Sequence, residues 1–113
     1  MTQVNKPWGY YKDLHRSPDG DVVLKMICID PGEEISYQFH KKRTEMWYVI
    51  SGKGKFIKNG VNRLVFPDDY VTIAPTAKHQ VVNTGTEPLC IYEMQCGECS
   101  EDDIVRLEDK YER

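Results

Sequence analysis

The stretch that decides the fold is residues 32–52, GEEISYQFHKKRTEMWYVISG. Gln38 and His40 are two residues apart, so in an extended strand their side chains lie on one face. The residues KKRT that follow suit a turn, and a returning strand can carry Glu45 back opposite His40. An amide oxygen, an imidazole and a carboxylate would then converge on one point, which is the ligand chemistry of a divalent transition metal. The stretch therefore predicts one half of a metal site.

A second stretch, residues 68–83 with the sequence DDYVTIAPTAKHQVVN, supplies the other half through His79. Taken alone, each of the two histidines would be interpreted as an ordinary surface or loop residue, because most histidines bind no metal. The histidines favour a metal site once the neighbouring amide and carboxylate are considered with them. The expected ligands are Gln38, His40, Glu45 and His79.

The length and charge of the chain narrow the classes of protein to which it can belong. At 113 residues it has room for one domain and one core. Its 18 acidic and 15 basic residues leave a formal net charge of -3, which does not indicate the clustered basic face of a nucleic-acid-binding protein. No apolar run approaches the ~18 residues of a membrane span, and the first residues lack the apolar core of a secretory signal. We therefore expect a cytoplasmic protein with neither a nucleic-acid nor a membrane partner.

The four cysteines, at positions 28, 90, 96 and 99, are too few and too irregularly spaced for the disulfide framework of a small secreted domain. Cys96 and Cys99 form one CxxC motif, whereas a zinc ribbon needs two such pairs. We therefore expect free thiols in a reducing compartment.

Short strands separated by turn residues are predicted through the middle of the chain. Asn59-Gly60 is the strongest hairpin signal, because both residues tolerate the positive φ of a type I′ turn. The expected strands are 22–30, 35–40, 46–51, 54–58, 61–66, 70–74, 79–83 and 89–95. Glycine, proline and asparagine divide them at intervals of roughly 8–12 residues, which indicates an all-β sandwich or barrel within residues 21–95.

The two ends of the chain follow other patterns. Residues 1–20 are aromatic-rich and interrupted by Pro7 and Gly9, so we expect an extended arm that lies over the barrel and ends in a turn. Residues 100–113, SEDDIVRLEDKYER, begin with a serine and acidic residues that favour a helix N-terminus. The apolar residues at positions 104, 107 and 111 then fall on one stripe. We therefore predict a short amphipathic C-terminal helix packed on the barrel.

The spacing of these residues resembles the double signature of the cupin superfamily. The first motif occupies residues 32–52, with Gln38 in place of its first histidine. The second motif matches at His79 and Asn83. It departs at three loop positions where glycine, proline and glycine are usual, namely Asp68, Ala74 and Thr76. Cupins are small β-barrels that hold one metal in the barrel mouth, so the resemblance implies a single cupin (jelly-roll) domain over residues 1–113.

A narrower resemblance covers nearly the whole chain. The segments that carry it are KPWGYY at 6–11, PGEEISYQFHKKRTEMW at 31–47, IAPTAKHQVVN at 73–83, PLCIYEMQ at 88–95 and EDDIVRLEDKYER at 101–113. They resemble type II mannose-6-phosphate isomerases, including the isomerase domain of bifunctional mannose-1-phosphate guanylyltransferases. In that family glutamine is expected at Gln38, whereas Met46 and Glu112 stand where histidine and glycine are typical. Alternation puts Met46 on the opposite face from Glu45, so its change can spare the metal while it alters activity or substrate choice.

The resemblance implies an isomerase that interconverts mannose 6-phosphate and fructose 6-phosphate with one divalent metal. Zinc is the first choice for that metal, and manganese, iron, cobalt and nickel are the alternatives. The metal needs an open coordination position for a substrate oxygen, since a closed site would be only structural. The expected partners are a small-molecule sugar phosphate and a second copy of the chain, because cupins of this kind are commonly homodimers.

The reaction also needs a base and a cation that holds the phosphate. Glu93, on the last predicted strand, is the first choice for the base and Lys78 the second. Arg106 is the first choice for the phosphate, with Lys110 and Arg113 behind it. An equally weighted alternative is that these basic residues form surface pairs with acidic residues four positions earlier on the predicted helix.

Two other functions stay open from the sequence. His40, Glu45 and His79 alone form a two-histidine, one-carboxylate set that suits iron(II) and oxygen chemistry. The change at Met46 would instead fit a non-catalytic sugar-binding cupin. Oxygen uptake would favour the first, and saturable binding of a sugar phosphate without turnover would favour the second.

Overall fold

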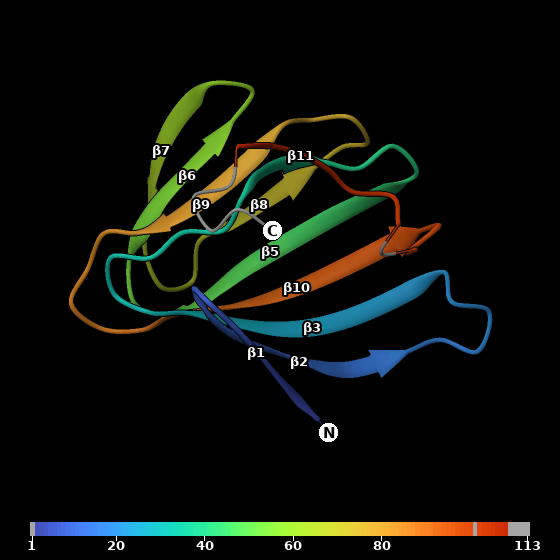
Figure 1. Cartoon of the computed structure of the whole chain (residues 1–113), viewed down its shortest axis with the longest axis horizontal. Helices are drawn as coiled ribbons and strands as arrows, with labels where there is room; N and C mark the ends of the chain where they lie inside the picture. The colour runs from blue at the N-terminus through green and yellow to red at the C-terminus, as the bar shows by residue number, and fades with distance from the viewer. Residues whose placement is uncertain (1, 101, 109–113) are drawn as a thin grey trace.

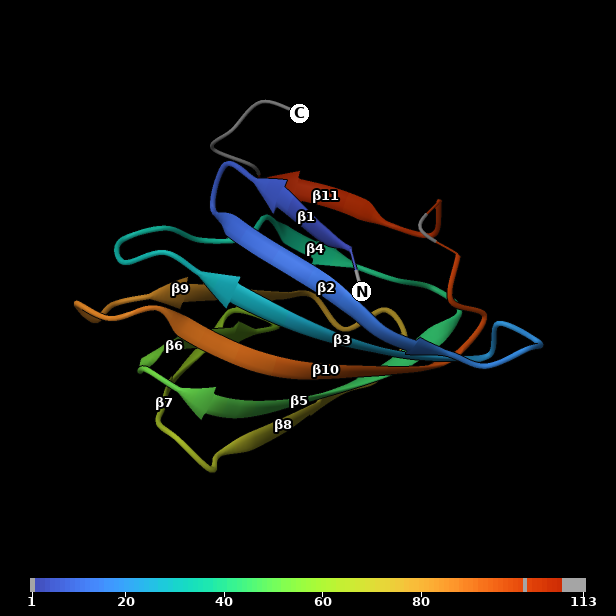
Figure 2. The same ribbon diagram turned by 90° about the horizontal axis from the view of Figure 1, so that it is seen from below.

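The chain forms two antiparallel β-sheets that face each other (Figure 1). The computed structural model describes residues 2–100 and 102–108. The first sheet contains, in spatial order, β1 (Gln3–Lys6), β2 (Gly9–Arg16), β3 (Val22–Ile29), β10 (Leu89–Gly97), β5 (Arg43–Ser51) and β8 (Tyr70–Ile73). The second contains β11 (Val105–Glu108), β4 (Tyr37–Phe39), β9 (His79–Asn83), β6 (Gly54–Lys58) and β7 (Val61–Val65). The predicted all-β barrel is confirmed, and both layers are visible in Figure 2.

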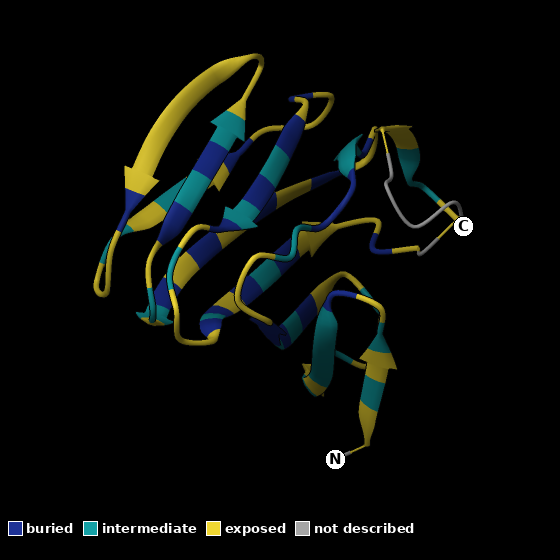
Figure 3. Ribbon diagram, turned by 60° about the vertical axis from the view of Figure 1, so that its left-hand side comes forward, coloured by how far each residue is buried: buried dark blue, intermediate teal, exposed yellow. Residues whose placement is uncertain are grey.

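The inner face of the first sheet changes from apolar to polar along its strands. Buried and exposed positions alternate along the strands, as the bands in Figure 3 show. Hydrogen-bonded register places three inward rows side by side across the sheet: Ile27–Ile91–Val49, then Lys25–Glu93–Trp47, then Val23–Gln95–Glu45. Because burying polar side chains is unfavourable unless they are paired, the polar rows mark the part of the barrel in which to look for a site.

The predicted hairpin at Asn59-Gly60 is confirmed. The two residues have φ of 48° and 81°, and Lys58 pairs with Val61 across the turn. A type I′ turn requires positive φ at both central positions, which Asn and Gly tolerate best.

One residue before β8 and one residue after it also have positive φ, although neither is glycine. Asp68 has φ of 75° and Thr76 has φ of 69°. These are the two positions at which the cupin signature usually carries glycine, so the loop geometry persists despite the substitutions. The Thr76 N–H donates to the backbone oxygen of His40 at 2.6 Å, which ties the β8–β9 loop to the end of β4.

The predicted C-terminal helix is wrong, because β11 occupies part of that segment. β11 pairs antiparallel with β4, with Val105 opposite Phe39 and Arg106 opposite Gln38. Without this pairing β4 would be an open sheet edge with unsatisfied backbone groups. A single short helix is only marginally stable in water, so the pairing of β11 with β4 is the more stable structure for these residues.

Asp103, one of the acidic residues of this segment, bonds to the barrel and not to a helix N-terminus. The Asp103 carboxylate accepts hydrogen bonds from the backbone N–H groups of Lys41 and Lys42, at 3.1 and 2.8 Å. Asp103 therefore holds the turn between β4 and β5. Positions 109–113, which include Lys110 and Arg113, lie outside the described residues.

The N-terminal residues are extended, but β1 and β2 form a hairpin that continues the first sheet beside β3. Gly9 permits this close approach, because a Cβ atom there would lie 2.1 Å from the Cys28 backbone oxygen. The hairpin places its inward side chains beside the polar end of the barrel. Among the described residues, no helix has the length and hydrophobicity needed to cross a membrane.

Candidate metal centre and its pocket

Three of the four predicted ligands come together at the polar end of the barrel. His40 follows β4, Glu45 lies on β5 and His79 is the first residue of β9, and one ligand atom from each lies within 4.8 Å of the others. The shortest approaches are 3.3 Å from His40 Nδ1 to Glu45 Oε2 and 3.7 Å from His79 Nε2 to Glu45 Oε1. All three side chains are buried. The turn after β4 and the return along β5 produce this convergence.

The donor atoms of this group fit a divalent cation. His40 Nδ1 and His79 Nε2 are buried and have no hydrogen-bond partner among the described residues. His79 Nδ1 lies 3.0 Å from the Ala77 carbonyl oxygen, which can only accept, so the His79 proton resides on Nδ1 and the lone pair on Nε2. Two imidazoles and a carboxylate that converge in this way are a typical donor set for zinc and related metals.

Burial keeps both imidazoles neutral, which is the form that binds a metal. Loss of solvent lowers the pKa of His40 to about 4, against the opposing charge of Glu45. The same desolvation lowers the pKa of His79. Both rings therefore carry a lone pair at neutral pH.

Glu45 is oriented by a donor on each carboxylate oxygen. Arg43 Nε donates to Oε2 at 2.8 Å, and Trp47 Nε1 donates to Oε1 at 2.9 Å. The three residues are two apart on β5, so alternation brings them to the same buried face. Such partners hold a ligating carboxylate in place.

Arg43 is a site residue that sequence analysis missed, because it was counted in the turn KKRT. It is the first residue of β5 and is 4% exposed. The signal that could have found it is its spacing of two from Glu45. Arg43 Nη2 also lies 2.7 Å from His40 Nε2. A guanidinium only donates and a neutral imidazole has one lone pair, so a cation at His40 Nδ1 and the Arg43 contact at Nε2 compete for the same ring.

Gln38 lies beside the histidines, but its oxygen has another partner. It is opposite His79 in the β4–β9 register and lines the same cavity as His40. Its Oε1 accepts a hydrogen bond from Ser36 Oγ at 2.7 Å. Gln38 as a fourth ligand stays a prediction.

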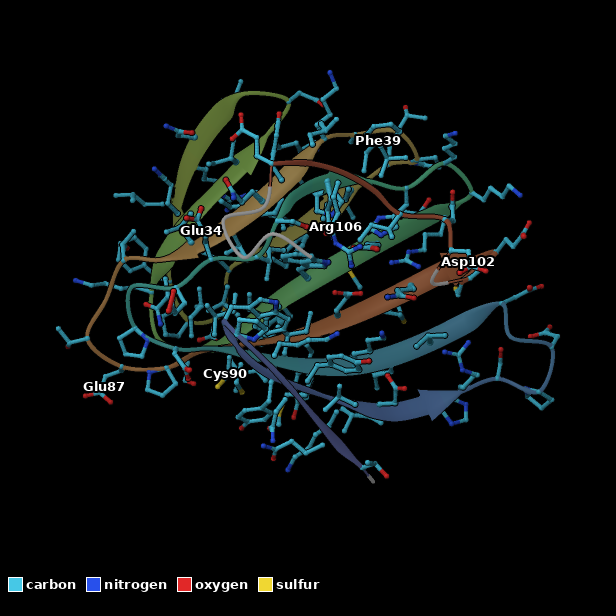
Figure 4. All side chains as sticks on the ribbon, in the orientation of Figure 1. Glu34, Phe39, Glu87, Cys90, Asp102 and Arg106 are labelled. Atoms are coloured by element: carbon cyan, nitrogen blue, oxygen red, sulfur yellow. The ribbon has the colours of Figure 1, made fainter. Side chains whose placement is uncertain are left out.

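A cavity of about 110 Å³ adjoins His40. Four of its lining residues are cations from four different segments, namely Lys6, Lys25, Arg43 and Arg106. Figure 4 labels Arg106, which reaches the cavity from β11. Lys78 is exposed and is not among the lining residues, so the structure does not bring this second choice of base to the site.

A larger groove of about 710 Å³ lies elsewhere, against β6, β7 and β8. Its charged lining residues include Arg63 and Asp68, and it contains none of the three metal-ligating side chains. The smaller cavity is the better site, because it is the one with buried donors that lack partners.

Glu93 lines the smaller cavity and has a strongly shifted pKa. Burial, and then the charge of Glu45, raise the pKa of Glu93 to about 8. Gln95 Nε2 donates a hydrogen bond to Glu93 Oε1, and Lys25 is its neighbour in the β3 register. A carboxyl group with a pKa near neutrality beside a metal site is a candidate acid or base.

Comparison with known proteins places the chain in a family. Residues 1–109 match the family described as "Mannose-6-phosphate isomerase C-terminal". The mannose-1-phosphate guanylyltransferase ManC of Salmonella typhimurium is 36% identical over 112 residues, which cover 98% of this chain and 23% of ManC. The chain thus spans about a quarter of this curated relative.

Solved structures show the same fold at low sequence identity. A Klebsiella pneumoniae protein with a double-stranded β-helix domain superposes with a TM-score of 0.76 at 20% identity, covering 95% of this chain and 85% of that one. A cupin 2 conserved barrel domain protein from Salinispora arenicola gives a TM-score of 0.67 at 23% identity, covering 76% and 73%. The chain therefore has the cupin fold and belongs to the mannose-6-phosphate isomerase C-terminal family.

Proposed function

We propose that this chain is a metal-dependent aldose–ketose isomerase of hexose 6-phosphates, with mannose 6-phosphate and fructose 6-phosphate as the pair interconverted. The observation that carries the proposal is the buried His40–Glu45–His79 group, next to a cavity that Glu93 lines. Two nitrogens of this group have no hydrogen-bond partner in the part of the chain that the structure describes. Membership of the family supports the choice of substrate.

The metal would be held by His40, Glu45 and His79, with Gln38 as the expected fourth ligand. A divalent metal bound there supplies Lewis-acid polarisation of the sugar carbonyl and stabilises developing negative charge on oxygen. Zinc is the first choice for such nitrogen and oxygen ligands, and the other divalent transition metals stay alternatives.

Glu93 is the proposed base. Its carboxylate would take the proton from C2 of the aldose, and the same group would return it to C1 after the sugar passes through an enediolate. The hydroxyl proton of O2 moves to O1 in the same overall change, so no atom is gained or lost. A pKa of about 8 suits a group that must both accept and donate this proton near neutral pH. The buried indoles of Trp8 and Trp47 line the cavity and limit its water.

Arg106 is the proposed phosphate ligand. It lines the cavity from strand β11, so helical i,i+4 pairing of Arg106 with Asp102 loses its geometric basis, whereas the pairing of Asp109 with Arg113 lies outside the described residues. Lys110 and Arg113 stay predictions. We expect Arg106→Ala to raise KM for a sugar phosphate, because the variant loses a charged hydrogen bond that contributes ~1.5–3 kcal/mol of binding free energy. Arg63→Ala on β7, outside this cavity, is the matched control, and equal KM values for the two variants would contradict the assignment.

A coupled isomerase assay on protein of known metal content tests the function. Mannose 6-phosphate should turn over, unphosphorylated mannose should not, and turnover should require the metal. Saturable binding without turnover in metal-loaded protein would make this chain a sugar-binding cupin. Met46, the feature that suggested lost activity, is 38% exposed and lies outside the cavity, which supports retained chemistry.

The two-histidine, one-carboxylate group also supports a second candidate, an iron(II)-dependent oxygenase. Oxygen consumption by iron-loaded protein, measured with an electrode beside the isomerase assay, separates the two. The homodimer stays a prediction, which sedimentation of the metal-loaded protein tests.

A further inference from the structure

Gln95 is a buried amide at the cavity, and the reaction proposed above gives it no role of its own. It lies on β10, is 1% exposed and lines the same cavity as His40 and Glu93. The register of the first sheet places Gln95 opposite Glu45 of β5, and alternation along β10 puts it on the same face as Glu93, two residues away. Gln95 is therefore a neighbour of both a predicted metal ligand and the proposed base.

The two ends of the Gln95 amide differ in what they contact. Gln95 Nε2 donates a hydrogen bond to Glu93 Oε1, which fixes the direction of the side chain. Gln95 Oε1 is buried and has no hydrogen-bond partner in the part of the chain that the structure describes. Because a buried polar atom without a partner is unfavourable, most such atoms are paired with protein, water or a ligand. The amide oxygen is thus a position at which a ligand would gain a hydrogen bond.

The chemistry around Gln95 Oε1 indicates which ligand group would pair with it. An amide oxygen only accepts hydrogen bonds, and the ionised carboxylates of Glu45 and Glu93 only accept them as well. A phosphate ester is also mainly an acceptor at neutral pH, so it would not satisfy this oxygen. A sugar hydroxyl both donates and accepts, and it can therefore pair with either end of an amide.

We propose that Gln95 binds the hydroxyl group on the carbon next to the sugar carbonyl. The identification of the ligand as a sugar phosphate rests on the proposed function. In that reaction the carbonyl oxygen belongs near the histidines and Glu45, and the proton to be moved belongs near Glu93. The hydroxyl one carbon from the carbonyl is then the group that a neighbour of both Glu45 and Glu93 would meet. Gln95 would hold this part of the sugar in the orientation that the proton transfer needs.

Calorimetric titration of the metal-loaded full chain with two sugar phosphates tests the contact. The two are mannose 6-phosphate and 2-deoxyglucose 6-phosphate, which lacks the 2-hydroxyl group. We expect the wild type to bind the deoxy sugar about 10-fold more weakly, because the hydroxyl is lost and Gln95 Oε1 stays buried without a partner. Gln95→Met keeps the length of the side chain and removes its amide, so its two affinities should lie within about 2-fold of each other. The same ratio in wild type and Gln95→Met would overturn the proposal.

Gln80→Met is the matched control. Gln80 lies on β9, donates hydrogen bonds to Glu34 and to the Ile35 carbonyl oxygen, and does not line the cavity. This variant should keep the preference of the wild type for mannose 6-phosphate. Metal affinity should be the same in Gln95→Met as in wild type. A loss of metal from Gln95→Met would make the amide oxygen a metal ligand and would overturn its assignment to the sugar.

Circular dichroism and thermal melting establish which variants fold. Gln95→Asn, which keeps an amide but is one methylene shorter, is the second variant, and it should lose most of the preference because its oxygen is withdrawn from the hydroxyl. Equal affinity of the wild type for the two sugars would overturn the contact whatever the variants do.

The isomerase assay separates failure of this contact from failure of the proposed function. A preference for the 2-hydroxyl that depends on Gln95, without turnover, would leave the contact standing and reject only the proposed function. Turnover with a preference that is independent of Gln95 would reject only the contact. No binding of mannose 6-phosphate would reject both.

Discussion

Glu45 is the residue on which the candidate metal centre depends. Its carboxylate is 1% exposed and receives donors from Arg43 and Trp47, while His40 and His79 approach the same two oxygens. Removing one partner of such a buried pair typically costs ~3–5 kcal/mol, because an uncompensated charge is left behind. The site is therefore an electrostatic unit in which each side chain stabilises the placement of the others.

His40→Ala should abolish stoichiometric metal binding. The variant loses one of the two nitrogens that converge on Glu45, and a two-ligand remnant holds a divalent cation poorly. Metal analysis after dialysis should fall from about one ion per chain to near zero. His15→Ala, at an exposed position of β2, should keep its metal. Full metal content in His40→Ala would remove β4 and its loop from the metal centre.

Glu93→Gln should flatten the pH dependence of stability in chelated protein. Burial raises the pKa of Glu93 from the ordinary value of 4.5 to about 8. Below pH 4.5 the group is protonated in both states and has no effect. As pH rises towards 8 the unfolded chain ionises and the folded chain does not, so folding loses stability across this window.

Urea titrations of wild type and Glu93→Gln at pH 5, 6.5 and 8 measure this effect. The difference in unfolding free energy between the two proteins should shift in favour of the variant as pH rises. Comparison with the variant cancels the opposite contribution of His40, whose lowered pKa makes stability fall as pH drops from 6.5 towards 4. A constant difference across the three pH values would show that Glu93 ionises normally.

At the scale of elements, short loops and edge strands hold the ligand-bearing strands in place. The β8–β9 loop is tied to His40 by the Thr76 N–H, and Asp103, just before β11, accepts hydrogen bonds from the β4–β5 turn. Segments that are distant in sequence thus form hydrogen bonds with both His40 and the turn that follows it. Strand β11 closes the edge of β4 in the same way.

Thr76→Gly should stabilise the protein. A β-branched residue at φ of 69° is strained by roughly 1–2 kcal/mol, which glycine avoids, although the greater freedom of glycine in the unfolded chain offsets part of the gain. We expect a net gain of about 0.5–1 kcal/mol in denaturant titrations. Thr86→Gly is the control, because Thr86 is not among the described residues with positive φ. Equal losses in both variants would mean that the Thr76 backbone carries no strain.

At the scale of the whole molecule, the barrel separates a core from a site. The apolar cluster includes Ile29, Leu89 and Ile91, each 0–1% exposed, and supplies the hydrophobic stability. The polar end buries His40 Nδ1, His79 Nε2 and Gln95 Oε1, which have no hydrogen-bond partner among the described residues. Such a site is least stable without its ligand, so metal binding and folding should be coupled.

Removal of metal should therefore lower the melting temperature. A metal present at 100 times its dissociation constant adds about 2.7 kcal/mol to stability. In a domain of this size that corresponds to a fall of roughly 10–20 °C after chelation, measured by calorimetry. The His40→Ala variant should melt at the same temperature with and without chelator. An unchanged melting temperature in wild type would contradict a metal site that is coupled to the fold.

Local pattern alone determined the strands between residues 22 and 95, apart from their exact ends, because period-two alternation and turn chemistry are properties of adjacent residues. It also determined the Asn59-Gly60 turn and the place of His40 and Glu45 around a return. It did not find β1, β2 or β11, and it began β5 three residues too late. Tertiary structure decided the rest. Whether residues 105–108 form a helix or a strand depends on the open edge of β4, which is distant in sequence. The burial of Arg43 and the gathering of Lys6, Lys25 and Arg106 at one cavity likewise depend on which strands become neighbours, and no local periodicity encodes that pairing.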